Sequence, residues 1–289
     1  MTGHPLRMLA RVTFDDPTVR LALLAVATGV LAGALGSWVV LRRQAFLAHA
    51  SGATAFAGAS VAGALSIAVL PAALAASALV AALTGRLALR RPETAQVATG
   101  LALSCGLAIG VIATRSGAPQ TGTSVLLGST LLASDADILT ALAVAGVATL
   151  LSVALGRWWL AAAVHPTGSP AGGVFAGAGW TARNADLVLL LMIGVASAAL
   201  LPVAGALLAG TLLVVPAATA QRIAPHPRRL VPAAGLLATA EMVIALQFAD
   251  ATDLPPGASA ALLAAAVDVV VALGVVAARR GARREVAVA

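Results

Sequence analysis

The sequence predicts an all-α, polytopic membrane protein with about eight transmembrane helices, and three observations support this. Of the 289 residues, 60% are apolar and only 10% are charged, and the mean hydropathy is +0.99. An ordinary soluble domain is roughly 45–50% apolar and about 25% charged. The apolar residues also fall into blocks of the length, about 20 residues, that crosses a bilayer as a helix. A cytosolic globular protein is therefore excluded, and a multi-pass protein of the cell membrane is expected.

The apolar blocks, taken in order, give a count of eight spans, with seven or nine as alternatives. They cover residues 21–41, 46–83, 94–113, 138–155, 187–202, 230–248 and 258–278. The second block is long enough for two spans, or for one span and a broken helix, with Pro71, Gly52, Gly58 and Gly63 as candidate break points.

Two further segments are not counted as spans. The uncharged segment 117–134 contains an apolar run too short to cross, so it is predicted to be re-entrant or interfacial. The semi-apolar stretch 205–223 is read as a helix that ends at Pro216.

The charged residues divide the chain into a polar N-terminal tail (1–20), a transmembrane domain (21–279) and a basic tail (280–289). Cytoplasmic loops carry an excess of arginine and lysine, which places the basic tail in the cytoplasm and the acidic loop 250–257 outside. Eight spans then put the N-terminus inside as well. The same count leaves Arg42–Arg43 and Arg90–Arg91 outside, which conflicts with the rule.

The kinds of polar residue present exclude several classes of function. All 18 basic residues are arginines, placed singly or in pairs between apolar blocks, so they form no nucleic-acid-binding stripe. Without a lysine there is no phosphate-binding loop of the G-x-x-x-x-G-K-[ST] type, and any ATP hydrolysis must come from a partner. Cys105 is the single cysteine and is interpreted as a packing residue. We expect no enzyme active site and no permanently bound cofactor.

Ionisable groups inside predicted spans are the candidate functional residues, because burying them in a membrane is costly. His49 lies among small residues, and a neutral imidazole suits a borderline divalent cation such as zinc. The alternative is a histidine that only hydrogen-bonds a neighbouring helix. Glu241 and Asp268 could line a cation path; a structural role, such as pairing with arginines, is favoured for both.

A second candidate surface follows Pro216, where a short polar helix, residues 217–223, is predicted. Such a helix on the cytoplasmic face could enter a groove of a soluble partner. The alternative is an ordinary connecting turn. The segment DLPPGASAALL, at 253–263, is predicted to form a rigid turn that starts the last span.

Four segments together resemble one known family. They are GSWVVLRRQAFLAHAS (36–51), SVLLGSTLLASDADI (124–138), GTLLVVPAATAQRI (210–223) and DLPPGASAALL (253–263). This order resembles the permease subunits of ABC importers for zinc, manganese and iron, over about residues 20–280. The last two motifs are the most specific.

The resemblance implies a homodimeric pore that is driven by cytoplasmic ATPase subunits and supplied by an extracytoplasmic metal-binding protein. It implies contact with the ATPase by the segment that holds Pro216, Ala217, Ala218, Thr219, Ala220, Gln221 and Arg222. The histidine of the family's G-D-A-L-S-H-A motif matches His49, which implies a role in metal passage; Glu241 is retained as a second candidate. The motif's aspartate falls on Ala45 and its glycine on Gln44, so the oxygen ligand that the resemblance implies is missing.

We therefore expect import of a divalent transition metal, with zinc favoured over manganese or iron because the site keeps an imidazole and lacks the carboxylate. Two alternatives remain open. One is an ABC permease for another solute, such as a metal chelate. The other is a secondary transporter that works without an ATPase.

Overall fold

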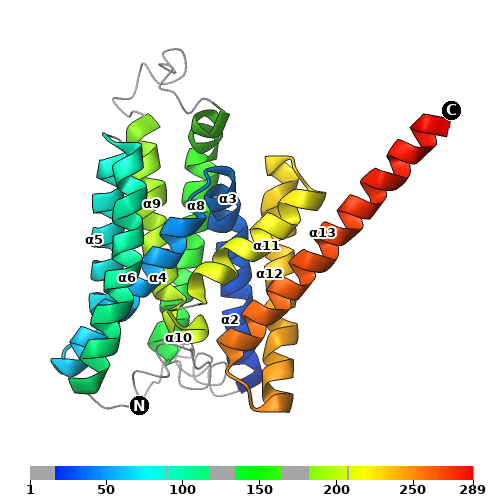
Figure 1. Cartoon of the computed structure of the whole chain (residues 1–289). Helices are drawn as coiled ribbons and strands as arrows, with labels where there is room; N and C mark the ends of the chain where they lie inside the picture. The colour runs from blue at the N-terminus through cyan, green and yellow to red at the C-terminus, as the bar shows by residue number, and fades with distance from the viewer. Residues whose placement is uncertain (1–16, 89, 117–133, 165–181, 207, 289) are drawn as a thin grey trace, which may run out of the picture.

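The computed structural model describes residues 17–88, 90–116, 134–164, 182–206 and 208–288, and the elements in these ranges are all helices. Figure 1 shows them as one bundle with a long oblique C-terminal helix. The helices are α2 (Pro17–Leu31), the π-helical turn η1 (Ala32–Gly36), α3 (Ser37–Leu41), α4 (Ala45–Ala64), α5 (Val69–Ala88), α6 (Pro92–Ser116), α8 (Asp135–Val164), α9 (Ala182–Ala199), α10 (Leu201–Ala204), α11 (Ala209–Ile223), α12 (Pro227–Thr252) and α13 (Pro256–Val288). The prediction of an all-α, multi-pass membrane protein is confirmed.

Within the described ranges, seven helices are long and apolar enough to cross a membrane. A further apolar helix, Asn184–Ala199, is shorter than these seven. Together they account for the eight spans expected from the apolar blocks. The predicted re-entrant segment lies outside the described residues, apart from Ser134.

The first span runs without a break through α2, η1 and α3, and its middle is a π-helical turn. The turn has the sequence AGALG, and all five of its residues are buried. A Cβ added at Gly36 would overlap the backbone carbonyl of Leu213 in α11. Because only glycine permits this approach, α11 can lie directly against the first span.

The second apolar block forms two spans, α4 and α5, joined at residues 65–68. Ser66 has a positive φ of 55° in this turn. None of the predicted break points lies there, because Gly52, Gly58 and Gly63 are within α4. Pro71 lies in the first turn of α5, where a proline costs no helical hydrogen bond. The break is thus a tight turn between two complete helices.

Two other helix starts agree with their sequence signals. Ser134 precedes α8, where Asp137 accepts hydrogen bonds from the Ser134 N–H at 2.8 Å and its hydroxyl at 2.7 Å. This is a capping interaction at the start of the helix. The turn before α13 contains Asp253, which has a φ of 55°, and the helix begins at Pro256.

The predicted end of a helix at Pro216 is wrong. Helix α11 continues through Pro216 to Ile223, and the proline is buried. Proline removes a single intrahelical bond, and packing against neighbouring helices allows a membrane helix to continue through it. The expected short polar helix is therefore the last part of a longer, continuous one.

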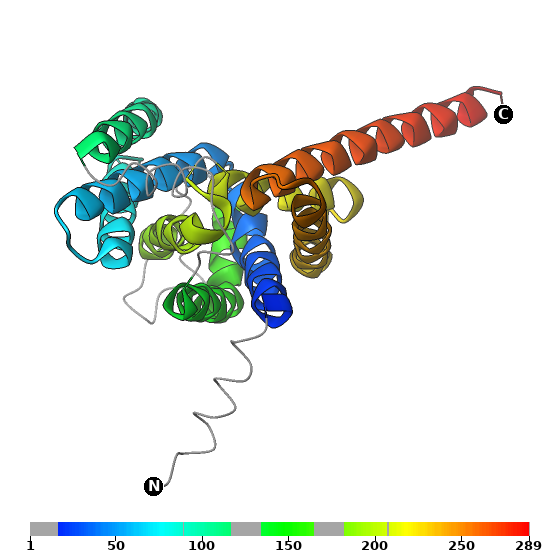
Figure 2. The ribbon, with the colours of Figure 1, turned by 90° about the horizontal axis from the view of Figure 1, so that it is seen from below.

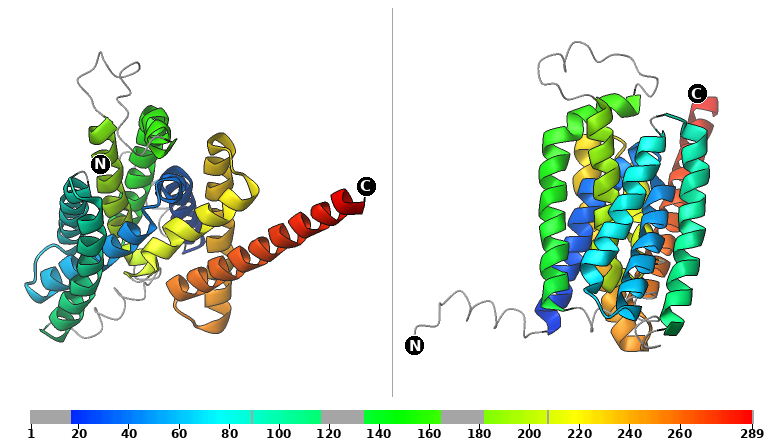
Figure 3. Two further views of the ribbon diagram at one scale, coloured as in Figure 1. Left: turned by 45° about the horizontal axis from the view of Figure 1, so that its top comes forward. Right: turned by 90° about the vertical axis from the view of Figure 1, so that its left-hand side faces the viewer.

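The course of α11 also resolves the conflict over orientation. Figure 1 shows α9 descending to α10, and α11 rising obliquely from there to the start of α12, so the stretch 205–223 reverses direction once more. As a result α2 begins at the lower end and α13 ends at the upper end, as the right-hand view of Figure 3 also shows. The expectation that both ends of the chain lie on one side is wrong, because α11 adds one more passage through the bundle to the eight expected spans.

This arrangement gathers the arginine pairs at one end of the bundle. Arg42–Arg43 follows α3 and Arg90–Arg91 follows α5, and both helices rise to the upper end. Arg228–Arg229 begins α12 at the same end. The positive-inside rule then makes the upper end the cytoplasmic one, without the conflict that the eight-span count produced.

Aromatic and ionic contacts fix this upper end of the core. The rings of Trp38 and Trp159 meet edge to face with centroids 5.6 Å apart. The Trp38 indole N–H donates to the Ser152 hydroxyl at 2.7 Å, and Arg42 pairs with Asp186 at 2.8 Å. Helices α3, α8 and α9 are thereby held together beside the start of α4.

Candidate transport site and coupling end

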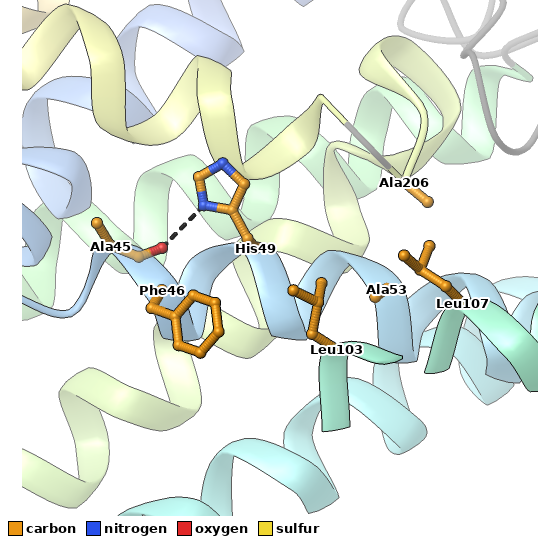
Figure 4. A pocket seen from close by; sticks show the side chains of 7 residues that line it. All are labelled: Ala45, Phe46, His49, Ala53, Leu103, Leu107 and Ala206. Atoms are coloured by element: carbon orange, nitrogen blue, oxygen red, sulfur yellow. Dashed lines mark hydrogen bonds between the residues drawn. The ribbon is translucent and has the colours of Figure 1, made fainter. Parts of the chain in front are cut away.

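His49 lies one turn into α4, where that helix crosses α11. A cavity of about 580 Å³ adjoins it, lined by Ala45, Phe46, His49, Ala53, Leu103, Leu107 and Ala206. Figure 4 shows the imidazole ring directed toward α11, while Phe46, Leu103 and Leu107 lie on the other side of the α4 backbone. The residues that line the cavity are therefore apolar apart from His49.

The hydrogen bonds of the ring define which nitrogen can bind a cation. His49 Nδ1 lies 2.9 Å from the Ala45 carbonyl oxygen. A carbonyl only accepts, so Nδ1 carries a proton, and in the neutral imidazole the lone pair is then on Nε2. Nε2 lies 3.4 Å from Thr211 Oγ1, on α11. The nitrogen that would serve as a ligand thus faces a hydroxyl of another helix.

A close approach between the two helices creates this geometry. A Cβ added at Gly210 would lie 2.9 Å from His49 Cγ and 3.0 Å from its Cα. Such distances are shorter than van der Waals contact, so a larger residue would push α11 away from His49. Neither Gly210 nor Thr211 is conspicuous in the sequence, although the two residues begin the motif GTLLVVPAATAQRI.

Glu241, the second candidate, lies elsewhere, in α12. Its side chain is 3% exposed, and neither carboxylate oxygen has a hydrogen-bond partner. No group of three or more His, Cys, Asp or Glu side chains that could hold a metal ion occurs among the described residues. Glu241 is not among the residues that line the cavity at His49.

The predicted coupling segment forms the last two turns of α11, and most of it is packed inside the bundle. Ala217 and Ala220 form a cluster with Leu230 and Ala234 of α12. Pro216 and Thr219 are also buried. What a partner could reach is the end of the segment and the residues that follow it. The exposed residues in this stretch are Arg222, Ile223, Pro225, His226, Arg228 and Arg229.

Asp268, in α13, takes the structural role that the sequence favoured. Its Oδ1 accepts a hydrogen bond from the Thr219 hydroxyl at 2.8 Å and from Arg222 Nε at 3.0 Å, and its Oδ2 accepts from Arg222 Nη2 at 3.2 Å. The alternative that Asp268 pairs with an arginine is confirmed. Nothing in the sequence spacing indicated that the arginine would be Arg222, 46 residues earlier.

Comparison with known proteins agrees with this architecture. The sequence signature of the ABC 3 transport family matches residues 15–275. The chain belongs to the ABC 3 transport family. It is therefore a membrane permease of the metal and metal-chelate ABC transporters, a transport pore rather than an enzyme, and it works with other components of such a transporter.

Two solved structures are similar to this ABC 3 family permease. PsaBC from Streptococcus pneumoniae, in complex with Fab, matches with a TM-score of 0.74 and 19% identity over 87% of this chain and 89% of that one. A protein described as a metal-chelate type ABC transporter, in an inward-facing conformation, matches with a TM-score of 0.64 and 16% identity over 90% of this chain and 89% of that one. No curated protein matches the sequence. At these identities the two structures support the fold alone.

Proposed function

We propose that this chain is the permease subunit of an ABC importer for a divalent transition-metal ion, with zinc as the favoured cargo. The observation that carries the proposal is the orientation of His49, whose Nε2 keeps a lone pair at the crossing of α4 and α11. An imidazole with a fixed tautomer is a good ligand for zinc. Its hydrogen bond to the Ala45 carbonyl has the form of the outer-sphere contacts that orient metal-binding histidines.

The composition of the site favours zinc over manganese. Ala45 replaces the aspartate of the family motif, so no carboxylate lies one turn before His49 on the same face of α4. Manganese prefers oxygen ligands, whereas zinc accepts nitrogen readily. We also propose that two copies form the pore, since one imidazole and one hydroxyl leave most coordination positions of a metal ion to water or to a second subunit.

The proposed partners act at opposite ends of the molecule. The exposed residues from Arg222 to Arg229 would contact the cytoplasmic ATPase subunits, and an extracytoplasmic metal-binding protein would deliver cargo at the end where α2 begins. Helix α11 joins the two functions, because it carries Thr211 at His49 and Arg222 at the other end. Eleven residues of helix separate them, a rise of about 16 Å. A movement imposed on Arg222 would thus be transmitted to the histidine through one continuous helix.

His49→Ala tests the proposed role of the histidine. We expect zinc uptake to fall by roughly tenfold or more in cells that lack other zinc importers, because the ligand nitrogen is lost. Cys105→Ala is the control, since Cys105 is exposed on α6 and does not line the cavity. Uptake at the wild-type rate by His49→Ala, with equal protein in the membrane, would remove His49 from the pathway. Glu241→Gln in the same assay decides whether Glu241 contributes to cargo passage.

A metal chelate is a second candidate cargo, and the cavity beside His49 favours it. Its volume of about 580 Å³ far exceeds that of a bare ion, and its lining is apolar apart from the histidine. Uptake of radioactive zinc alone and of zinc supplied with excess chelator separates the two cargoes. Transport only in the presence of chelator would support the second candidate.

Reconstitution separates either importer from a secondary transporter. In liposomes without the ATPase partner we expect no zinc flux down an imposed ion gradient. Flux under these conditions would show that the chain needs no ATPase.

A further inference from the structure

Helix α13 lies at the edge of the bundle, and this makes its attachment to the rest of the protein informative. It packs against α10, α11 and α12, and in Figure 2 its C-terminal half extends away from the other helices. Ala260 and Ala264 are buried where it meets the bundle. Its outer face is apolar and more than half exposed, with Leu262 at 67%, Val269 at 55%, Val270 at 69% and Leu273 at 65%.

Asp268 connects this peripheral helix to α11 through three hydrogen bonds. The donors are Thr219, one turn before the end of α11, and Arg222, which uses two nitrogens of its guanidinium group. Thr219 and Arg222 are three residues apart, so they lie on the same face of α11. We refer to Thr219, Arg222 and Asp268 as the clamp. A two-pronged arginine–carboxylate contact fixes orientation as well as distance.

The membrane makes the clamp specific. Asp268 lies within a span, where an unpaired charge is costly, whereas Arg222 lies at the exposed end of α11; removing Arg222 therefore leaves the carboxylate without its compensating charge. Apolar packing between the small residues of α11 and α13 would tolerate sliding or rotation, whereas the paired charges permit one register. The clamp thus sets the direction in which the Arg222 end of α11 points.

We propose that Asp268 is a positioning residue for energy coupling: it holds Arg222, and with it the exposed end of α11, in the orientation that the ATPase partner engages, and it makes α13 follow α11 during transport. The inference rests on the proposed function, in which the residues from Arg222 to Arg229 contact the ATPase. It adds that α13, through Asp268, takes part in that contact without touching the partner.

Asp268→Asn tests the clamp with little change of shape, because the amide keeps an oxygen that can accept from Thr219. The measurement is zinc transported per ATP hydrolysed in proteoliposomes that contain the permease and its ATPase, with a thermal melt of the purified permease alongside. We expect the ratio to fall by roughly fivefold or more while ATP is still hydrolysed, since coupling free energies of this kind correspond to such factors. Val270→Ala, at an exposed position of the same helix, should leave the ratio unchanged.

Exchange of the two charges provides a rescue. Arg222→Asp combined with Asp268→Arg restores opposite charges at the two positions, and we expect it to recover part of the ratio that either single variant loses. A wild-type ratio for Asp268→Asn would overturn the proposal. So would transport and hydrolysis that fall in parallel with the melting temperature, since that is the result of a purely structural role.

The role of the clamp can also be tested without knowing which solute the protein transports. If the wild-type protein carries no divalent metal, the proposed function fails, but binding of the ATPase subunit can still be measured by co-purification. The clamp then predicts weaker binding for Asp268→Asn and wild-type binding for Val270→Ala. Equal binding of both variants in that assay would overturn the clamp alone.

Discussion

At the scale of single residues, position 45 has an alanine where the motif that the sequence resembles has an aspartate. Ala45 lies one turn before His49 on α4, and its carbonyl accepts the Nδ1 proton of that histidine. The backbone thus keeps the imidazole oriented although the carboxylate side chain is missing. In the proposed function, the alanine removes an oxygen ligand and leaves the nitrogen ligand of His49 in place.

Ala45→Asp restores the missing carboxylate and should change which metal is carried. Aspartate at this position shares a face of α4 with His49 and adds the hard oxygen ligand that manganese prefers. We expect the ratio of manganese to zinc uptake to rise by roughly tenfold. Competition between the two labelled ions in the same cells measures this, with Ala45→Asn as the uncharged control. An unchanged ratio in Ala45→Asp would show that position 45 does not set selectivity.

Some of these residues can be predicted from the sequence and others cannot, for physical reasons. His49 could be found because an imidazole inside an apolar block is costly and therefore conspicuous. Thr211 and Gly210 could not, because a threonine and a glycine are ordinary in a membrane helix and gain their meaning only from the helix that crosses them. The pairing of Asp268 with Arg222 depends on the contact of α11 with α13, which no local pattern contains.

At the scale of helices, the buried glycine at the end of η1 determines how closely α11 approaches the first span. Any side chain at Gly36 would overlap Leu213, whereas a Cβ at Gly63 in α4 meets nothing within 4 Å. The two glycines therefore form a matched pair in which the same substitution has opposite consequences.

Gly36→Ala should destabilise the protein by about 1–3 kcal/mol, because α11 must shift to admit the methyl group. Gly63→Ala should be neutral or stabilise it by about 0.5–1 kcal/mol, since alanine favours the helix. Thermal melts of the two variants in detergent measure the difference. Equal melting temperatures would contradict the close packing of η1 against α11.

The apolar blocks predict the lengths of the helices closely, but they do not predict the residues at which the helices end. The turn between α4 and α5 at residues 65–68 contains no glycine or proline, so the usual sequence signals for a helix break are absent. The nearby glycines, which carry that signal, lie inside α4 instead. At Pro216 the signal for a helix end is present but the helix continues, because the packing of α11 allows it. Tertiary contacts decided both cases.

At the scale of the whole molecule, the passage of α11 determines the side on which each loop lies. When α11 is counted as a passage, all the described arginine pairs lie at the end where α3 and α5 finish. The turn around Asp253 lies at the opposite end. Hydropathy alone missed this passage because α11 is short, only 15 residues, and carries Gln221 and Arg222. The orientation of the chain therefore depends on a helix that a span count omits.

Cysteine labelling tests this orientation directly, because Cys105 is the single native cysteine and can be replaced by alanine. In that background, Asp253→Cys should react with a membrane-impermeant maleimide in intact cells, since the residue is exposed at the end opposite the arginine pairs. Arg91→Cys, also exposed, should react only after the cells are permeabilised. Because positively charged loops are retained in the cytoplasm, the two positions must give opposite results. Labelling of Arg91→Cys in intact cells would place the arginine pairs outside. It would also place outside the surface from Arg222 to Arg229 that we propose as the contact with a cytoplasmic ATPase.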